Sequence, residues 1–441
     1  MLERLFRLSE SGTTVRTEVI GGATTFMAMA YIIFVNPGML SSPGGAGMDF
    51  GAVMAATCVA SALATLLMGF LARYPIALAP GMGLNAYFSF IICGKMGVPW
   101  EIALGIVFIS GVVFTILAVV RVREMILTAI PTTLKLATAG GIGLFIAFIG
   151  LHDGGIIKAD PATFVTLGDL ENPPTLVALL GLVVTGSLMA ARVRGALFWG
   201  ILATGVVGII AGVTEFTGIV ALPDMSPTFL KMRPLAALRL EYLAPIFVLL
   251  FFDMFDTVGT LVGVGTQAGY MKDGRLPRAT QALLSDSIGT MAGAVVGTST
   301  TTSYIESIAG VSSGARTGLA NVVTAGLFLV ALFFSPLAKM FGVGIEGPGG
   351  VLLHPITAPA LIIVGCLMMK SVARIDWDDF SEAIPAFLTL IVMPFTYSIS
   401  HGLAIGFTSY PLLKLLSGRG REVHWLVYVL AGLFVLRYIF L

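Results

Sequence analysis

Residues 75–88 read Pro75-Ile-Ala-Leu-Ala-Pro80-Gly-Met-Gly-Leu-Asn85-Ala-Tyr-Phe88, and they interrupt an apolar segment. Pro80 removes a backbone donor and the two glycines relax steric limits, so a helix is expected to break here. Residues 297–310 read Gly297-Thr-Ser-Thr-Thr-Thr-Ser-Tyr-Ile-Glu-Ser-Ile-Ala-Gly310. Their Ser/Thr run favours extended backbone, with a helix restarting near Tyr304. Such backbone is tolerated at membrane depth only where it lines a cavity, so the two stretches are predicted to face each other across a binding site.

The composition around these stretches is that of a membrane protein. Lys, Arg, Asp and Glu together make up 11% of the 441 residues, hydrophobic residues make up 57%, and mean hydropathy is +0.97. A soluble domain carries about 25% charged residues. The sequence therefore predicts an all-α polytopic membrane protein. The net charge of +1 provides no basic surface for nucleic acid.

Fifteen apolar segments are long enough to be considered as spans. They lie near 19–37, 50–72, 75–95, 99–120, 132–151, 174–191, 195–213, 240–265, 279–297, 299–314, 317–338, 355–371, 383–398, 400–417 and 423–440. We expect fourteen of them to span, with 423–440 as an extra C-terminal segment.

Basic residues set the expected orientation, because cytoplasmic loops are enriched in Lys and Arg. With residues 1–18 in the cytoplasm, alternate loops carry Arg73, Arg121, Arg123, Arg192, Arg194, Lys272, Arg275, Arg278, Arg316, Lys370, Arg374, Lys414, Arg419 and Arg421. Lys231, Arg233 and Arg239 are exceptions in the predicted extracytoplasmic loop 214–239. The chain is predicted to cross the bacterial inner membrane or the plasma membrane many times.

The chain is also predicted to be duplicated. Asn85 and Glu306 are 306 − 85 = 221 positions apart, which is half the length, and each lies in the third segment of its half. Seven spans is an odd number, so the second copy (240–417) enters the membrane in the opposite sense to the first (19–213). Inverted repeats with broken helices in matching places indicate a secondary transporter.

Four acids lie deep in apolar segments: Asp253, Asp256, Asp286 and Glu306. Each costs roughly 2.5–3.5 kcal/mol at a helix centre, so such residues are usually functional. Asp253 and Asp256 are spaced i, i+3 and share one helix face. The four are candidates for proton coupling, although the serines beside Asp286 are also consistent with a structural role. The histidines lack metal-ligand spacing, and no metal site is predicted.

Several motifs resemble the nucleobase–cation symporter 2 / nucleobase–ascorbate transporter superfamily, and within it the AzgA-like hypoxanthine–guanine–adenine permeases. They are Phe34-Val-Asn-Pro37, residues 79–88, Phe255-Asp-Thr-Val-Gly-Thr-Leu261, residues 297–311, Arg316-Thr-Gly-Leu319, Ala383-Ile-Pro-Ala-Phe-Leu and Met393-Pro-Phe-Thr-Tyr397. The resemblance covers nearly the whole chain. It implies a seven-plus-seven inverted fold with a core (19–120, 240–338), a gate (132–213, 355–417) and short strands in spans 3 and 10.

The resemblance also implies proton-coupled uptake of purines (hypoxanthine, guanine, adenine), with no cofactor beyond H⁺, by motion of core against gate. It implies recognition by Asn85, Asp253 and Glu306, and a homodimer through gate helices. A purine edge presents N–H donors and ring acceptors that carboxylate, amide and backbone groups can match. Gly83, Leu84, Phe88, Ser303, Tyr304 and Ile305 complete the predicted site, with Phe88, Tyr304, Phe252 or Phe255 as the stacking ring.

Two alternatives remain open from sequence. A sulfate- or bicarbonate-type anion transporter would share the architecture, but Glu306 at a restarted helix would repel an anion. An intramembrane aspartyl hydrolase would use two of the aspartates, but the Gly-x-Gly-Asp motif is missing from the sequence. The prediction is a transporter and not an enzyme.

Overall fold

The computed structural model describes residues 2–120, 130–271, 276–347 and 350–440. The chain forms two compact units. Unit 1 comprises Met1–Val119 and His152–Ala360, and unit 2 comprises Val120–Leu151 and Leu361–Leu441. Four basic residues used for the orientation (Arg121, Arg123, Lys272 and Arg275) lie outside the described residues.

The first half of unit 1 is built from helices and three short strands. The elements are α1 (Leu2–Phe6), α2 (Val15–Met29), α3 (Ile32–Ser41), α4 (Phe50–Leu67), η1 (Met68–Ala72), β1 (Leu78–Pro80), α5 (Met82–Ala86), η2 (Tyr87–Lys95), α6 (Trp100–Val120), β2 (Ile157–Asp160), β3 (Phe164–Leu167), α9 (Pro173–Ala190) and α10 (Ala196–Ile210). The β2–β3 hairpin lies between residues 153 and 173 and adds strands to those expected in spans 3 and 10.

The second half of unit 1 also consists of helices and short strands. It contains η3 (Leu240–Tyr242), α11 (Leu243–Gln267), α12 (Ala279–Val296), β4 (Thr301–Ser303), α13 (Ser307–Ser312), α14 (Leu319–Ala331), η4 (Leu332–Phe334), α15 (Ser335–Gly342), β5 (Ile345–Glu346) and β6 (Leu352–Leu353). Unit 2 contains α8 (Thr132–Asp153) up to Leu151, most of α16 (Ala358–Met368), η6 (Met369–Arg374), α17 (Phe380–Phe395), α18 (Ile399–Leu416), η7 (Gly420–Glu422) and α19 (Trp425–Phe440).

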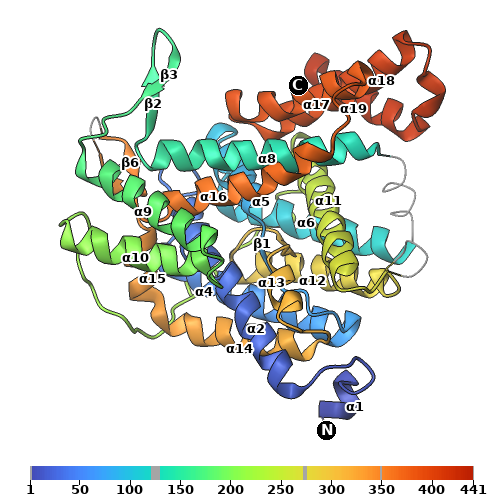
Figure 1. Cartoon of the computed structure of the whole chain (residues 1–441). Helices are drawn as coiled ribbons and strands as arrows, with labels where there is room; N and C mark the ends of the chain where they lie inside the picture. Colours follow the sequence, from blue (N-terminus) through green and yellow to red (C-terminus); the bar gives the residue numbers. More distant parts are fainter. Residues whose placement is uncertain (1, 121–129, 272–275, 348–349, 441) are drawn as a thin grey trace. The chain divides into compact units, whose positions relative to one another are not determined.

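The two interrupted stretches pair to form a small two-stranded sheet in unit 1, which can be found at the label β1 in Figure 1. β1 and β4 pair antiparallel, with Leu78 opposite Ser303, Ala79 opposite Thr302 and Pro80 opposite Thr301. β1 packs against α4, and β4 packs against α11 and α12. All six strand residues are buried, so the sheet lies inside the helical unit. The expected strands in spans 3 and 10 are therefore present.

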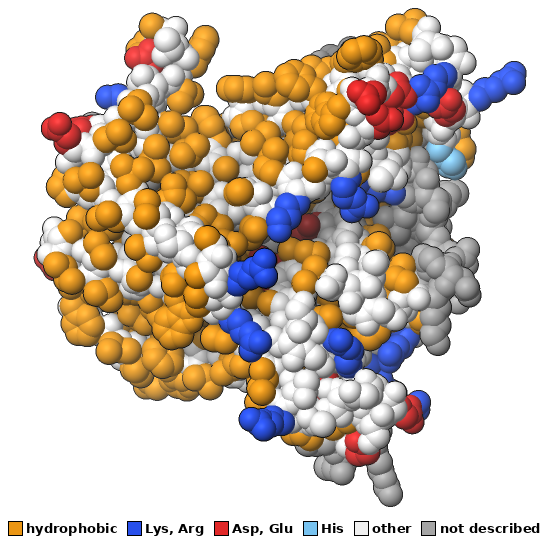
Figure 2. Space-filling model, viewed as in Figure 1, with side chains coloured by type: hydrophobic (Ala, Val, Ile, Leu, Met, Phe, Trp, Pro, Cys, Tyr) orange, Lys and Arg blue, Asp and Glu red, His pale blue; other side chains and the backbone are white. Residues whose placement is uncertain are grey.

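Each of the fifteen apolar segments contains a helix, which confirms the helical polytopic fold. Among the described residues, seven helices are long and apolar enough to cross a membrane, and shorter apolar helices such as Ala196–Ile210 and Phe380–Phe395 add to them. Figure 2 shows apolar side chains gathered over α9 and α10, where Leu180, Val183 and Ile210 are exposed. A surface of this kind suits lipid rather than water. The chain is a multi-pass membrane protein.

The compact units are grouped by contacts, whereas the core and gate are expected to move relative to each other, so that division stays a prediction. Helices α9 and α10, assigned to the gate by resemblance, belong to unit 1. A Cβ on Gly205 of α10 would lie 2.3 Å from the Phe341 ring of α15, and one on Gly195 would lie 2.7 Å from Met27 Cβ of α2. These two glycines let α10 approach the neighbouring helices of unit 1 closely.

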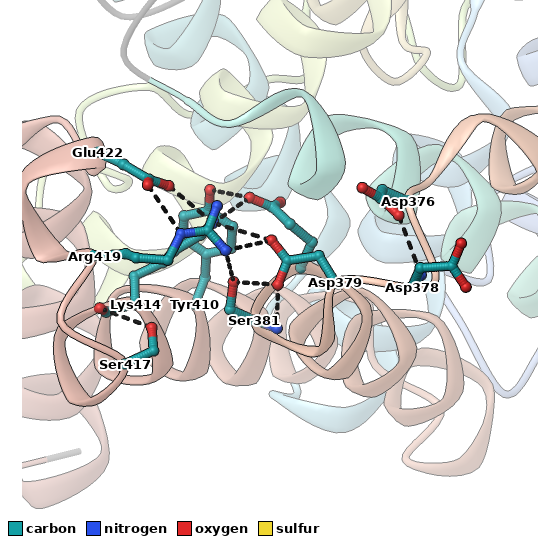
Figure 3. Close-up of polar contacts among 10 residues, drawn as sticks. Asp376, Asp378, Asp379, Ser381, Tyr410, Lys414, Ser417, Arg419 and Glu422 are labelled. Atoms are coloured by element: carbon teal, nitrogen blue, oxygen red, sulfur yellow. Dashed lines mark hydrogen bonds and ion pairs between the residues drawn. The ribbon is translucent and has the colours of Figure 1, made fainter.

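Unit 2 contains a compact ionic cluster where α17, α18 and η7 meet (Figure 3). Lys414 is only 1% exposed, and its Nζ lies 2.7 Å from Glu382, 3.3 Å from Glu422 and 3.7 Å from Asp379. Arg419 bonds Asp379 at 2.6 Å and Glu422 at 2.9 Å. The buried ammonium is compensated by several carboxylates, as a buried charge requires. This cluster ties η7, which leads into α19, to the two preceding helices.

Candidate functional site

The β1–β4 sheet is fixed by hydrogen bonds that extend beyond the strands. Gly81 N donates to Thr300 O at 3.0 Å, and Tyr304 N donates to Ala77 O at 2.9 Å. The Tyr304 hydroxyl donates to Pro80 O at 2.5 Å. The two interrupted stretches, far apart in the sequence, are thus bonded to each other over residues 77–81 and 300–304.

Asn321 of α14 anchors the approach to β1. Its Nδ2 lies 3.1 Å from Thr65 O, 3.0 Å from Tyr74 O and 2.8 Å from Ile76 O. The carbonyls of Tyr74 and Ile76, which lie outside any helix, are thereby satisfied by a side-chain amide. The backbone break therefore has a fixed geometry, which a binding site built on it requires.

Glu306 lies immediately before α13 and is half-buried. The Tyr31 hydroxyl donates to Glu306 Oε1 at 2.7 Å. Tyr31 follows the end of α2 and precedes α3, and its ring centroid is 6.4 Å from that of Tyr304. The first predicted span is therefore also interrupted, and the interruption between α2 and α3 places the Tyr31 side chain at the site. Sequence reasoning missed Tyr31, because the break at Ala30–Tyr31 contains no proline or glycine to signal it.

The two acids of α11 occupy different environments. Asp256 is exposed, and it accepts a hydrogen bond from Thr302 Oγ1 of β4 at 3.2 Å. Asp253 is 1% exposed, and its Oδ2 accepts from Thr290 of α12 at 3.2 Å. Glu306 follows Thr302 by four positions along the chain. Asp256 and Glu306 thus both adjoin β4, the first through its bond to Thr302 and the second through the chain.

Asp286 of α12 is fully buried and accepts from Thr257 Oγ1 at 2.8 Å. Its carboxyl group neighbours that of Asp253. One oxygen of each carboxyl group has no hydrogen-bond partner in the described part of the chain. These two acids lie behind β4, and the serines beside Asp286 do not bond its carboxyl group.

Asn85 of α5 is also buried, and its Oδ1 accepts a hydrogen bond from the Ser299 hydroxyl. Its Nδ2 is buried without a partner among the described residues, so a donor remains available there. The Ser303 hydroxyl is likewise buried and unpartnered within the described structure. Two of the predicted polar groups thus keep unused hydrogen-bonding capacity beside the sheet.

The remaining predicted residues divide by exposure. Gly83 is half-buried and Ile305 is 45% exposed, whereas Leu84 and Phe88 are buried. The Phe88 ring is 0% exposed, so neither face is open to a ligand in this conformation. The Tyr304 ring is 5% exposed. Of the four rings considered for stacking, Phe255 is the most open, and it packs on Phe251 with centroids 4.4 Å apart.

Three threonines that the sequence analysis did not assign individually connect the acids. Thr257, Thr290 and Thr302 each bond at least one carboxylate. The signal that finds Thr257 is its position directly after Asp256. The contacts of Thr290 and Thr302 depend on how α12 and β4 pack against α11, which sequence spacing does not reveal.

Comparisons with known proteins identify the family and the fold. A family model described as the Permease family matches residues 16–405, which is most of the chain. The chain belongs to this family, the nucleobase–ascorbate permeases. Its members are transporters, so this permease is not an enzyme, and the hydrolase alternative is set aside.

Two bacterial relatives of this nucleobase–ascorbate permease match it from end to end. It is 48% identical to the guanine/hypoxanthine permease PbuG of Bacillus subtilis, over 100% of both chains. It is 42% identical to the adenine permease AdeP of Escherichia coli, over 100% of this chain and 96% of AdeP. The predicted resemblance to purine permeases is confirmed at the level of the family.

Solved structures show the same fold at much lower identity. The transmembrane domain of the cyanobacterial bicarbonate transporter BicA has a TM-score of 0.63 at 14% identity, over 88% of this chain and 96% of that one. The murine anion transporter Slc26a9 has a TM-score of 0.64 at 10% identity, over 91% of this chain and 68% of that one. At such identities the likeness concerns the fold of this permease and not its substrate.

Proposed function

We propose that this permease takes up purine nucleobases by symport with protons. The observation that carries the proposal is that two acids adjoin β4 of the broken-helix sheet: the exposed Asp256 bonds Thr302, and the half-buried Glu306 follows the strand. Carboxylates suit a ligand edged by N–H donors. Relatives that match end to end are permeases for guanine, hypoxanthine and adenine, which supports a purine as the ligand.

Recognition would rest on Asp256 and Glu306, with Asn85 behind them. Each carboxylate oxygen can accept from an N–H of the purine edge, and Asn85 can donate through its free Nδ2. Direct contact with Asp253 was expected from the resemblance. Like Asn85 it is buried, but its carboxyl group neighbours that of Asp286, an arrangement suited to holding a proton. We therefore assign substrate contact on α11 to Asp256 and keep Asp253 and Asp286 as proton-holding groups.

The transport cycle would alternate the exposure of the site between the two sides of the membrane. Core and gate motion, a cytoplasmic N-terminus and a homodimer through gate helices complete the proposal. An acid that binds substrate and a proton together couples the two, because each ligand changes the affinity for the other.

The test uses the full chain reconstituted in liposomes. Labelled hypoxanthine, guanine and adenine are offered with an inward acid gradient, with no gradient, and with a protonophore; sulfate and bicarbonate are offered in parallel. We expect concentrative purine uptake that needs the proton gradient and is unchanged by replacing sodium with choline. Uptake of an anion with no purine uptake would overturn the proposal in favour of the anion transporter.

A further inference from the structure

A continuous line of hydrogen bonds joins Asp256 to Asp286. Asp256 Oδ2 lies 3.2 Å from Thr302 Oγ1, which lies 2.9 Å from Thr257 Oγ1, which lies 2.8 Å from Asp286 Oδ2. The two threonines come from β4 and α11, and both are at most 1% exposed. One end of the line is an exposed carboxyl group and the other is fully buried.

The number of protons in this line is limited. Three contacts each require one hydrogen, but two hydroxyl groups supply only two. The backbone N–H of Ser303 points at Thr257 Oγ1 at 3.3 Å, and it fills one of the acceptor positions of that oxygen. All three contacts are hydrogen bonds at once only when a third proton is present, on Asp256 or on Asp286.

Moving that proton from one aspartate to the other reverses the direction of all three hydrogen bonds. With the proton on Asp256, the carboxyl donates to Thr302, Thr302 donates to Thr257, and Thr257 donates to Asp286. With the proton on Asp286, every bond runs the other way. Both arrangements use the same heavy-atom positions, so exchanging them needs no movement of the backbone.

We propose that Thr302 and Thr257 form a proton relay between the exposed Asp256 and the buried Asp286. The inference rests on the proposed proton symport and names two positioning residues within it. In one transfer the O–H bond of Asp256 breaks as Thr302 gains its hydrogen, Thr302 passes its own to Thr257, and Thr257 passes its own to Asp286. Each hydroxyl gains one proton and loses one, so the net change is one proton moved from Asp256 to Asp286.

The residues around Asp286, at the buried end of the relay, favour holding a proton there. Asp253 neighbours Asp286, and the Thr290 hydroxyl faces both Asp253 Oδ2 at 3.2 Å and Thr301 O at 2.9 Å. Thr290 has one hydrogen for these two acceptors, so both contacts are satisfied when Asp253 is itself protonated and donates. At the other end, Asp256 bonds Thr302 of β4, the strand that leads into Tyr304 and Glu306, and Glu306 accepts from Tyr31. The relay thus leads from a group of substrate-facing side chains to a pair of buried carboxyl groups.

A function for the relay follows from the position of its ends. A substrate N–H that bonds Asp256 needs a carboxylate acceptor, and moving the proton inward exposes that carboxylate while keeping the proton in the protein. Release of substrate reverses the transfer and returns the proton to the surface. Substrate and proton would thereby travel together without competing for the same oxygen.

The test separates net symport from exchange. Thr257→Val and Thr302→Val remove each hydroxyl at nearly constant shape, whereas Thr257→Ser and Thr302→Ser keep it. Thr185→Val is the matched control, because Thr185 is a buried threonine of α9 whose hydroxyl bonds Gly181 O and, among the described residues, no carboxylate. Liposomes loaded with a pH-sensitive dye report purine-driven acidification of their interior. Counterflow of labelled hypoxanthine reports exchange of internal for external purine. In exchange the permease crosses back with substrate still bound, so no proton has to be released.

We expect both valine variants to lose purine-driven acidification by about tenfold or more, while counterflow continues and the pH dependence of uptake flattens. Both serine variants and Thr185→Val should acidify the liposomes as the wild type does. Wild-type acidification in both valine variants would overturn the relay and leave the proposed symport standing. Equal loss of exchange in the valine and serine variants would show a structural role and also overturn it. A wild-type protein that moves purine without protons would contradict the symport itself, and the relay with it.

Discussion

Pro80 lies opposite Thr301 in the β1–β4 pairing, and the two are 301 − 80 = 221 positions apart. Asn85 and Glu306 have the same separation, 306 − 85 = 221. In an antiparallel pairing the residue numbers of the two partners have the same sum at every pair, so their difference changes from pair to pair. Pro80 and Thr301 are therefore the one pair of this sheet whose numbers differ by 221. An inverted repeat with an offset of 221 residues would have its two-fold axis at this pair.

The first prediction concerns the three acids nearest the substrate. Glu306→Gln and Asp256→Asn should each weaken purine binding by about 1.5–3 kcal/mol, or roughly 10- to 100-fold, because each removes a charged acceptor. Asp253→Asn should change affinity less, since its carboxyl group is buried. Equilibrium binding of labelled hypoxanthine to purified protein measures all three. Loss of binding in Asp253→Asn with normal binding in Asp256→Asn would reverse our assignment.

Tyr31→Phe keeps the aromatic ring and removes the hydrogen bond to Glu306. The Glu306 side chain loses a fixed orientation, and we expect about 1 kcal/mol, or roughly fivefold, weaker purine binding. Tyr270→Phe is the control, because the Tyr270 hydroxyl also donates to one acceptor, Arg316 O, away from the site. Equal effects of the two substitutions would mean that the Tyr31 hydroxyl has no particular role in binding.

Glu18 provides a prediction on stability. Its carboxylate is 0% exposed and accepts from Arg316 N at 2.7 Å, Thr317 N at 3.3 Å and Ala320 N at 3.2 Å, around the start of α14. Glu18→Gln places an N–H₂ group against these donors, and we expect about 1–3 kcal/mol of destabilisation. Thermal unfolding in detergent should show a lower midpoint than for the exposed control Glu10→Gln. Equal midpoints would show that this carboxylate does not support α14.

The ionic cluster of unit 2 predicts a dependence on acid pH. Hydrogen bonds from Ser381 and Arg419 hold the pKa of Asp379 well below its usual range. Because the pKa of Asp379 is lower in the folded than in the unfolded state, its ionised carboxylate stabilises the fold. This stabilisation is complete above the ordinary pKa of about 4 and is lost as the pH falls below it. Hydrogen exchange should therefore show α17–α19 opening more readily on acidification below about pH 4. In Asp379→Asn this part of the pH response should be missing; if it persists, another group causes it.

The sequence predicted the architecture well because the decisive residues are local. Pro80, Gly81 and the Ser/Thr run break their helices whatever surrounds them, and apolar length marks the other segments. The distinction between Asp253 and Asp256 was out of reach, since i, i+3 spacing places both on one broad face. Only packing against α12 and β4 buries the first and leaves the second exposed.

Other features depend on tertiary contacts that spacing does not encode. The β2–β3 hairpin rests on two four-residue strands, too short for a reliable alternating pattern. The grouping of α9 and α10 with unit 1 depends on which helices Gly195 and Gly205 meet. Thr290 and Thr302 acquire their carboxylate partners through packing, as Tyr31 does.

The β1–β4 pairing constrains how the protein can be made. Because the partner of Pro80 follows 221 residues later, the ribosome needs about 10–45 s to supply it at ordinary elongation rates of 5–20 residues per second. During that interval the first interrupted stretch has no strand to pair with, and lipid cannot hydrate its free backbone groups. The first seven segments therefore have to wait in contact with water, the insertion machinery or a chaperone until the later half arrives.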